Sequence, residues 1–469
     1  MCADASGDGC YKNIDIYQLF KDEVKPALGC TEVVAIGLAT ATAFEALNGS
    51  VPCFLKNKSN SVSRKLRFDQ ITKITVKLDR NVYKNAKSVA IPVSKSLVGK
   101  VLKGIEDAII LGLFCDINSL KKGNELEIFK FASVEALKKL DIVSKIPIHI
   151  KVVDKWTGKS DIYIEAKIEA VKANEKLFGK TLIRHRHSNI TNISNDTGVL
   201  FRNTLKCFNH SEINKDLVLS LSLEDMITIS ENLPKRIKRV INKSIQVNMS
   251  LSRDGLNGKY GMNIGQSIHK LIRQKVLDNN IINQAKIQTA AACDARMGGS
   301  MKTAMSVGGA GNQGIMASIP IIVVAHNSGY DHKKLISALA LSYLITIFST
   351  HSSGELSASC GCGIKAGLGA AAGLTYYLGG KKEEIAAAIN NMASTIPGMI
   401  CDGAKSSCAM KLSSSTGIAI ESSLLALNGI HAYEGIANYK VEKTILNIGK
   451  ISNSQIFTDR ILVETILAT

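Results

Sequence analysis

Residues 146–153, IPIHIKVV, and residues 161–171, DIYIEAKIEAV, decide the fold class of the first half of the chain. Both stretches alternate apolar and polar side chains or run through β-branched residues, as do residues 71–78, ITKITVKL. A period of two predicts β-strands, whereas residues 15–48 carry the apolar spacing of a helix. The first half is therefore predicted to be α+β.

The second half of the chain has a different pattern. After about residue 209 the strand patterns fade, and helix-length apolar periodicity appears in several segments: 234–246, 264–277, 333–348 and 382–393. The stretch 187–203 is rich in Asn, Ser and Thr, which is typical of a boundary. We predict an α+β domain over residues 1–205, followed by a mostly α-helical domain over residues 206–469.

The composition is that of a globular protein with a basic surface. Of the 469 residues, 45% are apolar and 21% are charged, which excludes a disordered chain, and aromatic residues at 5% argue against an all-β sandwich. The net charge of +18 arises from 58 basic and 40 acidic residues, and most of the surplus lies outside residues 285–430. Dispersed lysines are typical of a solvated surface, so we do not expect a nucleic-acid partner.

Two features of the sequence concern location. The longest apolar stretches, 315–325 and 335–348, are shorter or more polar than the roughly 18 apolar residues that span a bilayer. The first residues, MCADASGDGCYKN, contain no apolar segment of a secretory signal. We therefore expect a cytoplasmic protein without a membrane partner. In that reducing compartment most of the 11 cysteines would be thiols, and a cluster of them indicates metal binding or catalysis.

Four cysteines lie in two short motifs of the second half. Cys360 and Cys362 belong to SGELSASCGCGIKAG, and Cys401 and Cys408 belong to CDGAKSSCAMK. Thiolates suit zinc or iron–sulfur clusters, and glycine-flanked loops can turn several sulfurs toward one centre. The spacing matches no common zinc or ferredoxin motif, so three interpretations stay open: a metal site, buried apolar cysteines, or a catalytic thiol.

A glycine-rich segment, GAGNQG at residues 309–314, matches the dinucleotide pattern GxGxxG. That pattern requires a preceding buried strand, and the preceding residues 293–307, CDARMGGSMKTAMSV, do not look like one. We interpret the segment as a turn at a helix N-terminus, whose free N–H groups can hold a carboxylate such as that of an amino acid.

Near the start of the chain, VKPALGCTE places Cys30 just before an apolar helix over residues 33–47. A helix N-terminus stabilises a thiolate and lowers the pKa of the cysteine, so Cys30 is a candidate base or nucleophile. The alternative is a capped helix with a buried cysteine. His185 and His187 are expected at the surface, and His351 is the only histidine that we consider a site candidate.

Five motifs, in order along the chain, carry a family resemblance: VKPALGCTE, CDARMGG, GAGNQGI, CGCGIKAG and CDGAK with SCAMK. Together they resemble the L-cysteine desulfidase family, whose C-terminal half is similar to the α-chain of iron–sulfur L-serine dehydratases. The resemblance implies a 4Fe-4S cluster with three cysteine ligands and one open iron. Cys401 and Cys408 would be two of the ligands, and the third would be Cys360 or Cys362, of which we favour Cys360.

The implied activity is a pyridoxal-independent β-elimination that converts L-cysteine to pyruvate, ammonia and sulfide. L-serine dehydration is the alternative, and a non-enzymatic iron–sulfur sensor or nucleic-acid-binding protein is the alternative of another class. We expect Cys30 to act as the base, with Glu32 as its rival and Thr31 orienting the substrate. Asn312 and Gln313 would receive the carboxylate of this small amino acid. A homodimer is left open.

Overall fold

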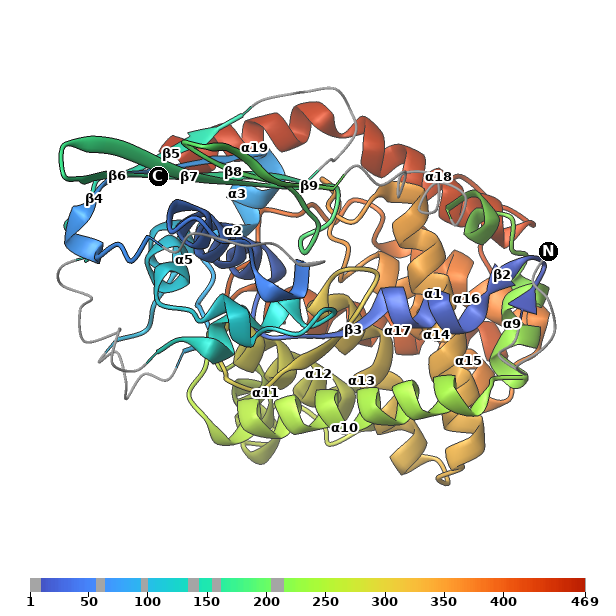
Figure 1. Cartoon of the computed structure of the whole chain (residues 1–469). Coiled ribbons are helices and arrows are strands. Elements are labelled where there is room, and N and C mark those ends of the chain that lie inside the picture. The colour runs from blue at the N-terminus through green and yellow to red at the C-terminus, as the bar shows by residue number, and fades with distance from the viewer. Residues whose placement is uncertain are drawn as a thin grey trace. The chain divides into compact units, whose positions relative to one another are not determined.

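Figure 1 shows the computed structural model, which describes residues 10–55, 64–93, 100–133, 143–153, 162–203 and 215–468. The chain divides into two compact units. The sheet unit consists of Ala27–Leu205, Asp402–Lys405 and Arg460–Thr469, and the helical unit of Met1–Pro26, Lys206–Cys401 and Ser406–Asp459. The predicted domain boundary at residues 205 and 206 lies outside the described residues, and so do residues 1–9 of the segment in which we expect no secretory signal.

The sheet unit contains one sheet with the strand order β5-β4-β6-β7-β8-β9. Its strands are β4 (Ile71–Leu78), β5 (Ile148–Val152), β6 (Tyr163–Lys172), β7 (Glu175–Arg184), β8 (Ile190–Asn195) and β9 (Gly198–Arg202). Only β4 and β5 pair in parallel, and the other neighbours are antiparallel. The three predicted strands are confirmed as β4, β5 and β6. The polar stretch that we expected to separate the domains forms β8 and β9 instead.

A tight hairpin joins the two longest strands of the sheet, β6 and β7. Lys172 pairs with Glu175, so the loop consists of Ala173 and Asn174 alone. These two residues have φ values of 50° and 66°. Two consecutive left-handed residues match the right-handed twist of the flanking strands, which fixes the register of the hairpin.

The helix α2 (Thr31–Leu47) packs against β6, β7 and β8 and is buried along almost its whole length. The shorter helices α3 (Arg80–Ala86) and α5 (Gly104–Leu113) also contact α2. Close approach depends on glycine: a Cβ at Gly179 would lie 2.1 Å from the carbonyl oxygen of Ala43, and one at Gly112 would lie 2.6 Å from that of Gly37. The apolar helix predicted after Cys30 therefore forms the core of this unit.

The helical unit contains most of the helices of the chain. They are α1 (Ile16–Glu23), α9 (Leu223–Glu231), α10 (Lys235–Asn257), α11 (Ile264–Arg273), α12 (Ile281–Met297), α13 (Gly311–Asn327), α14 (His332–Ser353), α15 (Lys365–Leu378), α16 (Lys382–Thr395), α17 (Cys408–Leu427) and α18 (Val441–Ser454). The last helix, α19 (Ile456–Ala468), begins in this unit. Figure 1 shows α10 as a long helix, and it packs along α12. The chain thus has its large sheet in the N-terminal half and mostly helices in the C-terminal half.

Two pairs of very short strands accompany these helices. β1 (Cys10–Tyr11) pairs with β2 (Ile14–Asp15), and β3 (Val24–Ala27) pairs with β10 (Ala304–Val307). The amide of Gly308 donates to the carbonyl of Glu23 at 3.0 Å, and the hydroxyl of Ser306 donates to that of Lys25 at 2.6 Å. Residues 23–27 are thereby attached to the loop that precedes α13.

Among the described residues, α14 is the one helix whose length and hydropathy would allow it to cross a membrane. In its most apolar window, 89% of the residues are buried inside the protein. A helix that is apolar all round and covered by its neighbours is typical of a protein core. The helix also packs against α13, α15 and α18.

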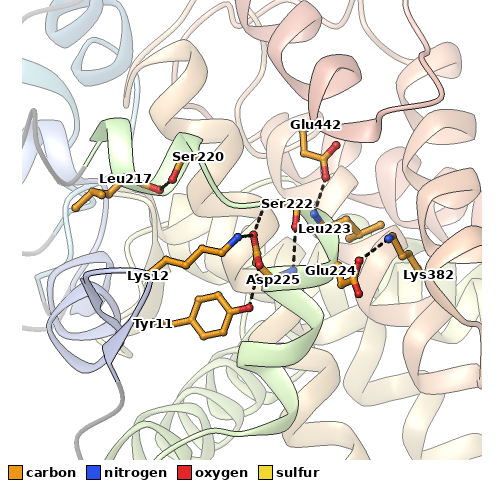
Figure 2. A network of polar contacts seen from close by, with 10 residues as sticks. All are labelled: Tyr11, Lys12, Leu217, Ser220, Ser222, Leu223, Glu224, Asp225, Lys382 and Glu442. Atoms are coloured by element: carbon orange, nitrogen blue, oxygen red, sulfur yellow. Dashed lines mark hydrogen bonds and ion pairs between the residues drawn. The ribbon is translucent and has the colours of Figure 1, made fainter. Parts of the chain in front are cut away.

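Asp225 joins the N-terminal segment to α9, as Figure 2 shows. Its carboxylate accepts a hydrogen bond from the hydroxyl of Tyr11 at 2.9 Å and forms an ion pair with Lys12 at 2.7 Å. Ser222 completes a capping box with Asp225 at the start of α9. Burial favours a higher pKa for Asp225, but the hydrogen bonds from Lys12, Ser222 and Tyr11 outweigh burial and lower it far below its usual range.

Candidate active site

The two cysteine motifs meet within the helical unit. The loop between α14 and α15 carries Cys360. The backbone amide of Cys360 donates to the carbonyl of Met399 at 2.7 Å. The amide of Cys401 donates in return to the carbonyl of Ala358, also at 2.7 Å. These reciprocal bonds form a short antiparallel bridge between Ser359 and Ile400, which joins the loop of Cys360 to that of Cys401 although the two are distant in sequence.

Cys362 and Cys408 approach the same place. Cys408 is the first residue of α17 and is buried. The pKa of the Cys362 thiol is raised well above its ordinary value by a hydrogen bond with Cys360, by burial, and by the charges that Cys360, Cys408 and Cys401 carry as thiolates. The other three predicted cysteines therefore all lie within electrostatic reach of Cys362.

The predicted carboxylate site lies at the start of α13. Asn312 and Gln313 are buried in its first turn, and the side-chain oxygen of Asn312 accepts a hydrogen bond from Arg296 at 3.0 Å. The Gln313 oxygen accepts one from the hydroxyl of Thr350, also at 3.0 Å. A Cβ at Gly361 would lie 3.3 Å from the Gln313 nitrogen. Gln313 therefore touches the loop that carries Cys360 and Cys362.

The local structure before α13 differs from the sequence prediction. A strand was not expected before the glycine-rich segment, but β10 ends only a few residues before α13 begins. The short strand contains Met305 and Val307, and its polar neighbours obscured it in the sequence. Because β10 pairs only with β3 in a two-stranded sheet, it is not part of a dinucleotide-binding βαβ unit.

The remaining predicted site residues lie in the sheet unit. Cys30 is the N-cap residue of α2, and its thiol donates to the Glu32 carboxylate at 2.7 Å. The hydroxyl of Thr31 donates to the same carboxylate oxygen at 3.1 Å. All three side chains are buried. Cys30 thus lies at the helix N-terminus, where the dipole favours a thiolate, with a proton acceptor in direct contact.

His187 was expected at the surface, and this prediction is wrong. It is only 4% exposed, and its Nε2 lies 3.9 Å from the second oxygen of Glu32. Asp79 is also within its electrostatic reach: burial raises the pKa of Asp79, while hydrogen bonds from backbone amides and the charge of His187 oppose that rise. Cys30, Glu32 and His187 therefore form one connected group of titratable side chains.

Three further basic side chains, including the candidate His351, have structural partners. Lys405 forms an ion pair with Asp402, and the ammonium of Lys411 donates to the carbonyl of residue 400 at 2.8 Å. His351 lies 3.3 Å from the carboxylate of Glu23. These contacts attach loops or the N-terminal segment, so we assign these residues no part in the chemistry.

Comparison with known proteins gives the family. Residues 132–460 match the family model described as serine dehydratase alpha chain. The chain belongs to this family. A UPF0597 protein of Clostridium botulinum (strain Okra / Type B1) is 34% identical over 93% of this chain and 92% of its own length. A UPF0597 protein of Clostridioides difficile (strain 630) is 33% identical over 95% and 98%, and one of Parabacteroides distasonis is 35% identical over 96% of both chains.

The serine dehydratase alpha resemblance raises the question whether the four cysteines suit an iron–sulfur cluster. Among the described residues, no three Cys, His, Asp or Glu side chains are arranged to hold a single metal ion. A four-iron cube separates its protein ligands more widely than one ion does. Three thiols within electrostatic reach of Cys362, on loops of small residues, have the donor type of such a cube, and any three of the four would supply the ligands of a cluster with one open iron. The donor set therefore fits the cluster better than a single ion.

Lys365 is a buried cation directly after the loop of Cys360 and Cys362, and we did not predict it as a site residue. It begins α15, is only 2% exposed, and donates to the carbonyl of Gly354 at 2.6 Å. Burial lowers the pKa of Lys365 to about 8, although the nearby Cys362 and Cys401 act in the opposite direction. The signal was present in the motif CGCGIKAG, where a lysine follows the cysteines directly.

Proposed function

We propose that the chain is a lyase that eliminates the β-substituent of L-cysteine with a 4Fe-4S cluster, forming pyruvate, ammonia and sulfide. The family supports a lyase acting on a small amino acid, and the L-cysteine desulfidase resemblance supports cysteine as the substrate. L-serine is the second candidate substrate, because the family model is that of a serine dehydratase.

The single observation that carries the proposal is the bridge between the cysteine loops. Backbone hydrogen bonds of 2.7 Å in both directions join the loop of Cys360 to that of Cys401, and Cys360, Cys401 and Cys408 lie within electrostatic reach of Cys362. Buried cysteines that merely fill a core need no such convergence. We propose Cys401, Cys408 and Cys360 as the ligands, with Cys362 as the alternative third ligand.

A cluster with three cysteine ligands would offer an iron with an open position, which acts as a Lewis acid toward the departing sulfur or oxygen. The chain's own residues would place the substrate and move its α-proton. The start of α13, with Asn312 and Gln313, would hold the substrate carboxylate. Loss of the α-proton and of the β-substituent with its bonding electrons gives 2-aminoacrylate, which hydrolyses to pyruvate and ammonia.

We propose Cys30 as the base that accepts the α-proton. Its thiol already donates to Glu32 at 2.7 Å, so transfer of this proton to the carboxylate would generate the thiolate. His187, 3.9 Å from the other carboxylate oxygen, is a positioning residue that acts through Glu32. The hydroxyl of Thr31 would fix the side-chain carboxylate of Glu32 through its hydrogen bond of 3.1 Å.

The test is anaerobic purification, followed by iron and sulfide analysis and by assays of pyruvate release from L-cysteine and L-serine. Cys401→Ala and Cys408→Ala should lose iron and activity together. The matched control is Cys293→Ala, because Cys293 is a fully buried cysteine of the same unit that is not a proposed ligand. Full iron content in Cys401→Ala would contradict the ligand assignment, and comparing Cys360→Ala with Cys362→Ala identifies the third ligand.

A second set of variants tests the base. Cys30→Ala should keep its iron and lose turnover. His187→Gln should keep the iron and leave Cys30 in place, but shift the pH dependence of kcat, because a titratable group next to Glu32 is removed. An unchanged pH profile in His187→Gln would remove His187 from the proposal and leave Cys30 and Glu32 in place.

A further inference from the structure

Arg296 is a buried cation without an anionic partner. Its side chain is only 3% exposed, and its Nη1 donates to the neutral amide of Asn312 at 3.0 Å. The Nε group is buried without a hydrogen-bond partner. Across the described residues, no carboxylate forms an ion pair with Arg296. Asp294, two residues before it, instead accepts the backbone amide of Gly265.

A buried guanidinium in this state is energetically costly. Arginine keeps its proton in proteins, so it cannot become neutral as a buried lysine can. Burying an unpaired charge remains costly even after the protein relaxes around it. Such a side chain is retained most simply when a ligand supplies the missing negative charge.

The position of the guanidinium indicates where that ligand binds. A Cβ at Gly311 would lie 2.4 Å from Nε and 2.7 Å from Cζ of Arg296, so the guanidinium lies against the first residue of α13. This 17-residue helix directs the unpaired N–H groups of its first turn and the positive end of its dipole to the same place. Gly308 and Gly309, with φ values of 58° and 81°, turn the backbone sharply just before it.

Two independent features therefore favour an anion at this point: the helix N-terminus and the unpaired arginine. Glu355 also lies against this loop, with its Cδ 2.9 Å from a Cβ placed at Gly309. The buried ammonium of Lys365 also lies within electrostatic reach of Glu355, so the charge of this carboxylate is opposed by that cation. A bound anion would place a negative charge directly against this guanidinium.

The neighbourhood narrows the class of ligand. Gln313, in the first turn of α13, touches the glycine between Cys360 and Cys362. Cys293 lies within electrostatic reach of Arg296 and also of Cys408 and Cys360. A ligand at this point must therefore be short, with a carboxylate at one end and a sulfur or oxygen only a few bonds away. An α-amino acid with a β-thiol or β-hydroxyl group has this form.

We infer that Arg296 and the N-terminus of α13 bind the α-carboxylate of the substrate, so that the chain selects free amino acids and rejects analogues without a carboxylate. This inference rests on the proposed function, and it assigns the guanidinium of Arg296 as the charge partner of the substrate carboxylate. The guanidinium fork can donate two parallel hydrogen bonds to a carboxylate, which fixes the orientation of the substrate as well as its charge.

The competing interpretation is that Arg296 balances the negative charge of the cysteine thiolates. The two interpretations differ in what Arg296→Gln loses. If the residue binds the carboxylate, the variant keeps its iron and raises the KM for L-cysteine about 100-fold. If the residue balances the thiolates, the variant loses iron. The glutamine can still donate to Asn312, which protects the local fold.

The experiment compares wild type, Arg296→Gln, Arg296→Lys and the control Arg253→Gln, which removes an exposed arginine of α10 in the same unit. Iron content, circular dichroism and the steady-state constants for L-cysteine are measured for each variant. We expect Arg253→Gln to match wild type and Arg296→Lys, which keeps the charge but not the fork, to have an intermediate KM. Loss of iron in both Arg296 variants, or an unchanged KM in Arg296→Gln, would overturn the inference.

A binding measurement separates this inference from the proposed function. Calorimetry with 3-mercaptopropionate, which has a carboxylate, and with cysteamine, which has none, requires no turnover. Wild type should bind 3-mercaptopropionate more tightly, and Arg296→Gln should lose that preference. If no amino acid is turned over but the preference and its loss are observed, the proposed reaction fails and the carboxylate site stands. Equal binding of the two probes to wild type would overturn the site.

Discussion

Replacing Asp294 by asparagine should make the protein more stable, and increasingly so as the pH rises. Asp294 is 1% exposed, and its carboxylate accepts the backbone amide of Gly265 at 3.0 Å at the start of α11. Burial raises its pKa to about 6 from an ordinary 3.8, although the backbone amides of residues 262, 264 and 265 oppose the rise. Asparagine keeps an acceptor oxygen for these amides and removes the buried charge.

The magnitude follows from the difference between the folded and unfolded pKa values. A rise of about two units corresponds to about 3 kcal/mol. Because the pKa of Asp294 is raised on folding, the contribution of this group to the free energy of unfolding is fully present below the unfolded pKa. This contribution is lost as the pH rises through about 6. At pH 5 the unfolded carboxyl is already ionised, so about half of the loss, roughly 1.5 kcal/mol, falls between pH 5 and pH 8.

The assay is urea unfolding by far-ultraviolet circular dichroism at pH 5, 6, 7 and 8, for wild type and Asp294→Asn. The free energy of unfolding of the variant minus that of wild type should increase by about 1.5 kcal/mol over this range. Asp331→Asn is the matched control, because Asp331 caps α14 with an exposed carboxylate and asparagine is an equally good cap. A pH-independent difference for Asp294→Asn would refute the reasoning.

Two further predictions concern packing and the attachment of the N-terminus. Gly255→Ala should destabilise the protein by about 1–3 kcal/mol in urea unfolding, because a Cβ there would lie 1.9 Å from the carbonyl oxygen of Ala291. Gly417→Ala, whose Cβ would meet no atom closer than 3.7 Å, should instead stabilise it by up to about 1 kcal/mol. Asp225→Asn should weaken the ion pair with Lys12 (Figure 2) and speed cleavage of the N-terminal segment in limited proteolysis. Because the pKa of Asp225 is lowered on folding, this effect should be fully present at pH 7 and begin to decline only as the pH falls below about 4, toward the much lower folded pKa. Equal cleavage of variant and wild type at pH 7 would contradict it.

The sequence predicted the strands with plain alternation and missed those whose buried face is small or polar. β4 and β6 place isoleucines, valine and alanines in the core at every second position. In β7 the corresponding positions include Gly179 and Thr181, because α2 packs too closely there for large side chains. In β8 the buried Asn195 donates to a carbonyl of α2. A period-two search for apolar residues cannot find such strands, since tertiary packing selects their side chains.

For the candidate site, the sequence supplied the residues but not the way they meet. Cys360 and Cys401 were named from their motifs, yet the backbone bridge that joins their loops has no sequence pattern. His187 was missed because it lies in the run RHRH, which is typical of an exposed basic loop. Its burial depends on the turn between β7 and β8 and on the carboxylate of Glu32 in α2. Contacts between elements that are distant in sequence decide both cases.

The small residues of the helical unit have two distinct roles, and the structure separates them. At Gly373 a Cβ would lie 2.7 Å from the carbonyl oxygen of Ala338, so this glycine lets the backbone of α15 approach that of α14. At Gly311 the same substitution would meet the guanidinium of Arg296. The first kind of glycine permits close helix packing, as in any core of this composition. The second kind makes room for a charged side chain that the fold itself does not neutralise, and therefore belongs to binding rather than to packing.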